Sequence, residues 1–116
     1  MKTAVIAFDS QQFNVILARM LNDLGFRVVT SEFFMQAVDA CREKKADVLL
    51  TDWTFDGKSI QDLLKKISPF SNVVLVSQKN TPSEIEKALK LGIKEYIMKP
   101  FDSDILQNKL ATLELI

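Results

Sequence analysis

Histidine is absent from this chain of 116 residues, and cysteine occurs once, at Cys41. These absences exclude histidine-based acid–base chemistry, a zinc site built from cysteine and histidine, and an intramolecular disulfide. A lone thiol is also consistent with a reducing compartment. Cys41 falls among apolar positions at helical spacing, so we expect it to be buried and to pack as a small hydrophobic side chain.

Long apolar runs and net charge are lacking as well. The run near the amino terminus extends only over residues 4–8, which is too short for a signal-peptide core or a membrane span. The 15 basic and 15 acidic side chains cancel, so no electrostatic field favours nucleic acid or anionic lipid. We therefore expect a cytoplasmic protein that binds neither a membrane nor nucleic acid directly.

Glycine is scarce too, with three in the chain and no Gly-rich phosphate loop. This argues against a nucleotide binder or a small flavodoxin-like enzyme. With 47% hydrophobic and 26% charged residues, the composition is that of an ordinary globular protein. The length suits one core, so we expect residues 1–116 to form a single domain.

Short apolar runs alternate along the chain with segments whose apolar positions recur at helical spacing. Two residues can cap helices: Thr81, which precedes Pro82, and Asp102. We expect the inner helix faces to include Ile16 and Leu89. The predicted strands are 3–8, 26–30, 48–51, 72–76 and 95–98, and the predicted helices cover 13–24, 34–45, 60–67 (stopped by Ser68-Pro69), 82–91 and 103–115.

This alternation predicts an α/β fold, because parallel neighbours require a crossover that a helix supplies. The alternation does not determine the strand order, and the economical choice is a doubly wound, five-stranded parallel sheet of order 2-1-3-4-5, which is a flavodoxin-like (βα)5 arrangement. In that order the first and third strands are neighbours, and Asp9 and Asp52 follow them side by side. Ser77 and Lys99 follow the next two strands at the same edge.

This set of side chains favours phosphoryl chemistry. Two carboxylates suit Mg²⁺, which binds through one or two carboxylates together with waters and phosphate oxygens. Ser77 and Lys99 supply donors for the remaining phosphoryl oxygens, and a carboxylate can itself accept the group. Each residue alone has a simpler explanation, because Asp9 could cap a helix, Ser77 could belong to a turn, and Lys99 could be a solvated charge.

The chain resembles the receiver domains of bacterial two-component response regulators over essentially its whole length. The residues that carry the resemblance are Asp9-Ser10, Asp52 after residues 47–51, Ser77, and the run Tyr96-Ile-Met-Lys99-Pro100-Phe101. The resemblance implies that Asp52 accepts phosphate from a histidine kinase or phosphotransferase. It also implies roles for the other residues: Asp9, Asp52 and the Thr54 main-chain carbonyl hold Mg²⁺, Lys99 and Ser77 contact the phosphoryl group, and Tyr96 changes rotamer with the state of Ser77.

Three departures from the family pattern stand out. Phe8 occupies the first of two positions that are normally acidic, so one acidic ligand, often water-mediated, is missing. The loop of residues 53–57 is shorter than usual and lacks the customary Met-Pro segment. Gln78 follows Ser77 where a small residue is usual. These departures bear on metal affinity and on the rate of phosphorylation, but not on the fold.

The sequence is consistent with two functions. In the first, the chain is a phosphoacceptor regulator, not an enzyme, that switches a protein-binding face formed by helix 82–91, strand 95–98 and helix 103–115. In the second, it is a pseudo-receiver that binds proteins without phosphorylation. The presence of Asp52, Ser77 and Lys99 favours the first function, and Phe8 favours the second.

Overall fold

The computed structural model describes residues 1–43, 46–67, 72–79 and 81–116. Five of its strands form one parallel sheet in the order β2-β1-β3-β6-β7. Because a separate small hairpin takes the numbers β4 and β5, this is the predicted 2-1-3-4-5 order. The elements are β1 (Thr3–Ala7), α1 (Gln11–Asp23), β2 (Arg27–Thr30), α2 (Phe34–Glu43), β3 (Val48–Thr51), β4 (Thr54–Phe55), β5 (Lys58–Ser59), α3 (Ile60–Ile67), β6 (Val73–Ser77), α4 (Pro82–Lys90), β7 (Glu95–Met98) and α5 (Ser103–Thr112).

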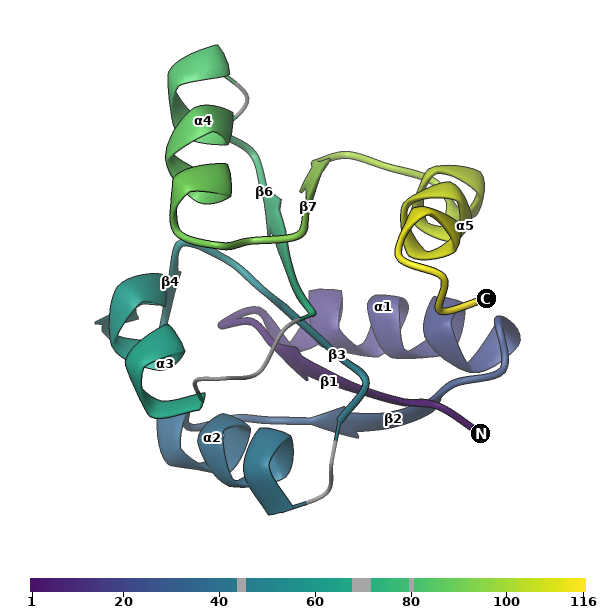
Figure 1. The fold of residues 1–116 in the computed structure, drawn as a ribbon. Coiled ribbons are helices and arrows are strands. Elements are labelled where there is room, and N and C mark those ends of the chain that lie inside the picture. Colours follow the sequence, from purple (N-terminus) through teal and green to yellow (C-terminus); the bar gives the residue numbers. More distant parts are fainter. Residues whose placement is uncertain (44–45, 68–71, 80) are drawn as a thin grey trace.

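Helices cover both faces of the sheet (Figure 1). Alternate residues of each strand enter different cores, as the pleat requires. In β1, Val5 and Ala7 pack under α2, α3 and α4, whereas Ala4 and Ile6 pack under α1 and α5. All five β1 residues are buried, and each large apolar side chain of these cores contributes about 1.5–3 kcal/mol by leaving water. We call the two sides the α2/α3/α4 face and the α1/α5 face.

The helix ends follow local sequence signals. Thr81 Oγ1 accepts from Glu84 N–H at 3.2 Å, and Asp102 Oδ1 accepts from Ile105 N–H at 2.9 Å, so both predicted caps are confirmed. Ser10, rather than Asp9, caps α1 through a bond from Phe13 N–H at 3.2 Å. Asp9 is thereby left available to the strand-end edge of the sheet.

Some expectations at the helix surfaces are wrong. Ile16 and Leu89 are 58% and 57% exposed, although helical spacing places both among inner positions. The predicted helices 82–91 and 103–115 end earlier, at Lys90 and Thr112. The predicted helix end at 44–45 and the stop at Ser68-Pro69 lie outside the described residues.

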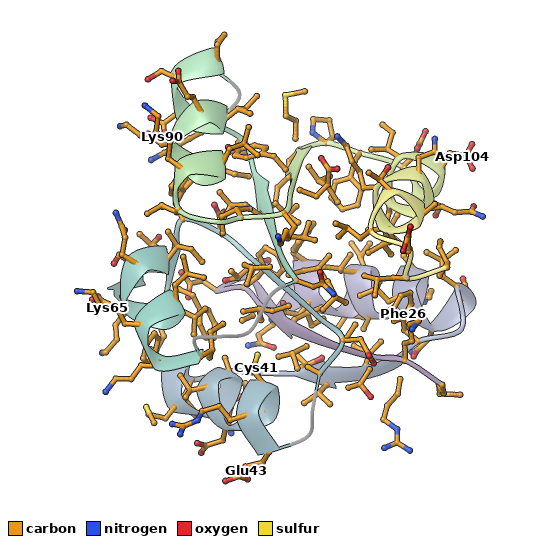
Figure 2. The ribbon with its side chains drawn as sticks, viewed as in Figure 1. Phe26, Cys41, Glu43, Lys65, Lys90 and Asp104 are labelled. Atoms are coloured by element: carbon orange, nitrogen blue, oxygen red, sulfur yellow. The ribbon has the colours of Figure 1, made fainter. Side chains whose placement is uncertain are left out.

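Cys41 is buried as expected, on the side of α2 that faces the sheet, whereas Glu43 at the end of that helix is exposed (Figure 2). Burial raises the pKa of the Cys41 thiol from 9.0 to about 12. The thiol therefore stays protonated at neutral pH and behaves as a core side chain. None of the helices in the described part of the chain has the length and apolar character needed to cross a lipid bilayer.

A two-stranded hairpin, β4–β5, follows the central strand at the Asp56-Gly57 turn signal, and its two short strands are not among the five predicted strands. Its turn is the Asp56-Gly57 pair, with φ angles of 53° and 74°. Positive φ at both central positions is the condition for the tight turn that matches the twist of a hairpin, and Asp-Gly meets it at low cost. The short loop after Asp52 is thus an ordered structure at the strand-end edge.

Candidate functional site

The carboxyl ends of the central strands bring the predicted residues to one edge of the sheet. Ala7 and Thr51 are register partners, so the residues that follow β1 and β3 begin side by side. The Thr51 hydroxyl donates to the Ala7 carbonyl at 2.8 Å in the interior and fixes the two ends together. A cleft of about 240 Å³ opens at this edge, and it is lined by Asp52, Trp53, Thr54, Ser77, Gln78, Lys79 and Lys99.

Asp52 lies at the cleft with its two oxygens in different settings. Oδ1 accepts the Trp53 backbone N–H at 2.7 Å. Oδ2 lies 3.9 Å from Lys99 Nζ, which is within ion-pair range and beyond hydrogen-bond range. The Asp52 side chain is 32% exposed, so the carboxylate remains open to a reactant from solvent.

Lys99 follows β7, and its peptide bond to Pro100 is cis. The ammonium lies 4.0 Å from the centroid of the Phe13 ring and 5.1 Å from that of Phe8. Phe8 does not point into the Asp52 cleft as a missing ligand would. It continues the alternation of Ala4 and Ile6, is 3% exposed, and packs on the α1/α5 face.

Asp9 is held by the hairpin turn. Its Oδ1 accepts the Asp56 backbone N–H at 2.9 Å, and Asp56 Oδ2 in turn accepts Phe34 N–H at 2.8 Å. Asp56 therefore links the acid after β1 to the start of α2. Sequence reasoning missed this role, although the Asp-Gly pair was the signal for the turn that makes it.

The donor set at this edge fits Mg²⁺ by its chemistry. The available ligands are the Asp9 and Asp52 carboxylates and the main-chain carbonyl of Thr54, all of them hard oxygens. The described residues contain no cluster of three or more carboxylate, thiol or imidazole side chains that could hold a metal. A dication here would therefore keep several waters or substrate oxygens, which is the usual state of protein-bound Mg²⁺.

Ser77 and Tyr96 are connected through the backbone of Lys79. The Ser77 hydroxyl oxygen accepts Lys79 N–H at 3.1 Å, and the Tyr96 hydroxyl donates to the Lys79 carbonyl. Trp53 Nε1 donates to the Tyr96 hydroxyl oxygen at 3.3 Å. Tyr96 is 6% exposed and Ser77 is 3% exposed, so both side chains are buried, and Ser77 lines the cleft.

Comparison with protein families matches residues 4–111 to the response regulator receiver domain. Among curated proteins, the chemotaxis protein CheY1 of Helicobacter pylori (strain ATCC 700392 / 26695) is 32% identical, over 94% of this chain and 94% of that protein. A putative NtrX-like response regulator of Rickettsia bellii (strain RML369-C) is 31% identical over 88% of this chain, which spans 22% of that longer protein.

Solved structures agree on the fold. The chemotaxis response regulator CheY4 of Vibrio cholerae superposes with a TM-score of 0.87 at 18% identity, covering 97% of this chain and 98% of that one. The receiver domain of the Pseudomonas aeruginosa PAO1 sensor histidine kinase PA1611, crystallised with magnesium in its active site cleft, gives a TM-score of 0.82 at 21% identity, over 96% and 95% of the two chains. At these identities the likeness supports the fold alone.

Proposed function

This chain belongs to the response regulator receiver domain family, and on that premise we propose that Asp52 accepts a phosphoryl group from a histidine kinase or phosphotransferase. The observation that carries the proposal is the position of Asp52. Its carboxylate is open to the cleft at the end of the central strand, and a cation lies 3.9 Å from Oδ2. Receiver domains are regulatory phosphoacceptors rather than classical enzymes, and the same is proposed for this chain.

The transfer is a displacement at phosphorus. Asp52 Oδ2 is assigned as the nucleophile because Oδ1 already accepts the Trp53 N–H. An O–P bond forms as the N–P bond of a phosphohistidine donor breaks, and the departing imidazole nitrogen takes up a proton from solvent. Such a transfer depends mainly on positioning and on charge neutralisation.

The surrounding residues supply both requirements. Lys99 faces the developing charge, and Ser77 can turn its hydroxyl proton toward a phosphoryl oxygen because its oxygen already accepts the Lys79 N–H. Asp9, Asp52 and the Thr54 carbonyl would hold Mg²⁺, which neutralises phosphoryl oxygens when it is bound. Asp9 enters this set already oriented by the Asp56 N–H.

The downstream face is proposed on α4, β7 and α5. Each of these elements exposes a large apolar side chain: Leu89 at 57%, Met98 at 49% and Ile105 at 42%. Tyr96 lies on β7 and is tied to the cleft through Lys79. Charge added at Asp52 would attract the Ser77 hydroxyl, and the connected Lys79 backbone would carry that bias to Tyr96.

The test is phosphorylation of the intact protein by acetyl phosphate with Mg²⁺, measured by mass. We expect one phosphate on the wild type and none on Asp52→Asn, because the amide is nearly isosteric but is a poor nucleophile. Asp104→Asn is the matched control, because this carboxylate is exposed in the first turn of α5 (Figure 2). Labelling of Asp52→Asn at the wild-type rate would refute the assignment.

A second function, protein binding without phosphorylation, is favoured by two observations. Phe8 stands where the family pattern has an acid, and Tyr96 is buried with its hydroxyl hydrogen-bonded to Trp53 and Lys79. In that case the binding face is preformed and Mg²⁺ with acetyl phosphate adds no mass. The mass measurement therefore separates the two functions.

A further inference from the structure

The Lys99 ammonium is held by aromatic rings as closely as by the acceptor carboxylate. Its Nζ lies 4.0 Å from the Phe13 ring centroid and 3.9 Å from Asp52 Oδ2. The second distance is too long for a hydrogen bond, so the carboxylate attracts the cation without fixing its direction. The Lys99 side chain is only 21% exposed, which strengthens the attraction between a cation and a ring face.

The two rings are themselves fixed. Phe8 and Phe13 meet edge-to-face with centroids 4.8 Å apart, and Phe13 meets Phe101 in the same way at 6.1 Å. The Phe8 carbonyl accepts the Asn14 side-chain amide at 2.9 Å in the interior. Rings packed in this way present their faces at defined positions before any ligand arrives.

We propose that Phe8 and Phe13 are positioning residues that hold the Lys99 ammonium beside Asp52. The proposal extends the phosphoacceptor role proposed for Asp52 and rests on it. An acid at position 8 would pair with Lys99 and neutralise part of its charge. Neutral rings orient the same cation and leave its full charge to the incoming phosphoryl group. Phe8 thus gives Lys99 a cation–ring contact in place of an ion pair with an acid.

Two variants at Phe13 distinguish the effect of the aromatic ring face from the effect of side-chain volume. Phe13→Leu keeps an apolar side chain but removes the aromatic face, whereas Phe13→Tyr keeps the face and can place its hydroxyl toward solvent, since Phe13 is only partly buried. We expect acetyl phosphate with Mg²⁺ to label Phe13→Leu about fivefold more slowly than wild type, and Phe13→Tyr to retain the wild-type rate to within about twofold. Ile16→Leu, one turn along α1 and 58% exposed, is the matched control.

A second measurement does not depend on phosphorylation. Proton NMR should show the Lys99 side-chain methylenes shifted upfield by the ring currents in wild type and Phe13→Tyr. In Phe13→Leu the shift should be clearly smaller, because only the more distant Phe8 ring remains. Amide fingerprints establish that each variant is folded, and Phe13→Met replaces Phe13→Leu if the latter unfolds.

Three outcomes would overturn the proposal: unshifted Lys99 signals in the wild type, a wild-type rate in the folded Phe13→Leu, or equal slowing in Phe13→Leu and Phe13→Tyr. If the wild type takes up no phosphate at all, the phosphoacceptor function fails, and the NMR signals alone then decide whether the rings hold Lys99.

Discussion

The two faces of the sheet hold their functional side chains by different interactions. On the α1/α5 face, Lys99 rests against Phe8 and Phe13 and is not hydrogen-bonded to Asp52. On the α2/α3/α4 face, Tyr96 is fixed by two hydrogen bonds, one from Trp53 and one to the Lys79 carbonyl. Both side chains come from β7 or the residue after it, and the period-two alternation of the strand sends them to opposite sides.

This difference suits the two tasks that we propose for Lys99 and Tyr96. A cation that must follow a new phosphoryl group benefits from an attraction with broad geometry, and a ring face offers that. A hydroxyl that reports a change benefits from directional bonds that are either made or broken. Under the proposed function, Lys99 on the α1/α5 face would serve the chemistry, and Tyr96 on the α2/α3/α4 face would serve the readout.

The largest effect is expected from Lys99→Met, which removes the cation but keeps an unbranched side chain against the rings. Labelling by acetyl phosphate should slow by about a hundredfold, because a preorganised charge facing the phosphoryl oxygens is lost. Lys90→Met is the control, since Lys90 lies on the exposed surface of α4 (Figure 2). Equal rates in the two variants would contradict a role for Lys99.

Phe8→Asp replaces the cation–ring contact between Phe8 and Lys99 with an ion pair. We expect Mg²⁺ to bind about tenfold more tightly, because a negative charge close to the strand-end edge attracts a dication across several ångströms even though this side chain does not enter the Asp52 cleft. Titration of Trp53 fluorescence beside the site measures this affinity. Phe8→Asn is the control, as it makes the same change in size without the charge. An unchanged or weaker Mg²⁺ constant in Phe8→Asp relative to Phe8→Asn would show that this position does not influence the metal.

Tyr96→Phe tests the opposite face by removing only the hydroxyl. The unfolding free energy should fall by about 1–2 kcal/mol, since the Trp53 indole N–H and the Lys79 carbonyl lose a buried partner. Denaturant unfolding measures the loss, and the Asp52 labelling rate should stay at the wild-type value. A slowed rate would mean that the two faces are not separate.

The smallest effect on stability is expected from the Cys41 thiol, and only in alkaline solution. The folded thiol has its pKa raised from 9.0 to about 12, so above pH 9 the unfolded chain releases its proton first and unfolding becomes easier. Stability should be nearly unaffected by this group below about pH 8 and should decline by about 1 kcal/mol between pH 9 and pH 10. Denaturant unfolding of Cys41→Ala over the same pH range should lack this extra slope, and an identical slope would exclude the thiol as its cause.

Most of the residues at the strand-end edge of the sheet could be predicted from the amino-acid sequence alone. Apolar runs ending in Asp9, Asp52 and Ser77 place those residues at strand ends, and the Lys99-Pro100 pair follows β7. These features depend on contacts between residues that are near in sequence, or on a period that can be read along it. The alternation does not determine the strand order; the order 2-1-3-4-5 is the economical choice and agrees with the family resemblance, and the sheet has this order.

The remaining features depend on which surfaces meet. Helical spacing counts Ile16 and Leu89 as inner positions, yet both are exposed, because a helix buries only the stripe that another element covers. The Asp56 N–H reaches Asp9 across 47 positions of the chain, and nothing in either segment indicates the pairing.

By itself, then, the sequence determined the alternation of strands and helices, the caps at Thr81 and Asp102, and the acidic and basic residues that end the strands. Only the tertiary structure decided that Phe8 and Phe13 face Lys99, and that Trp53 and Lys79 hold Tyr96. The physical reason is that caps and alternation are local backbone properties, whereas cation–ring and hydroxyl contacts exist only once distant segments are packed to within a few ångströms of one another.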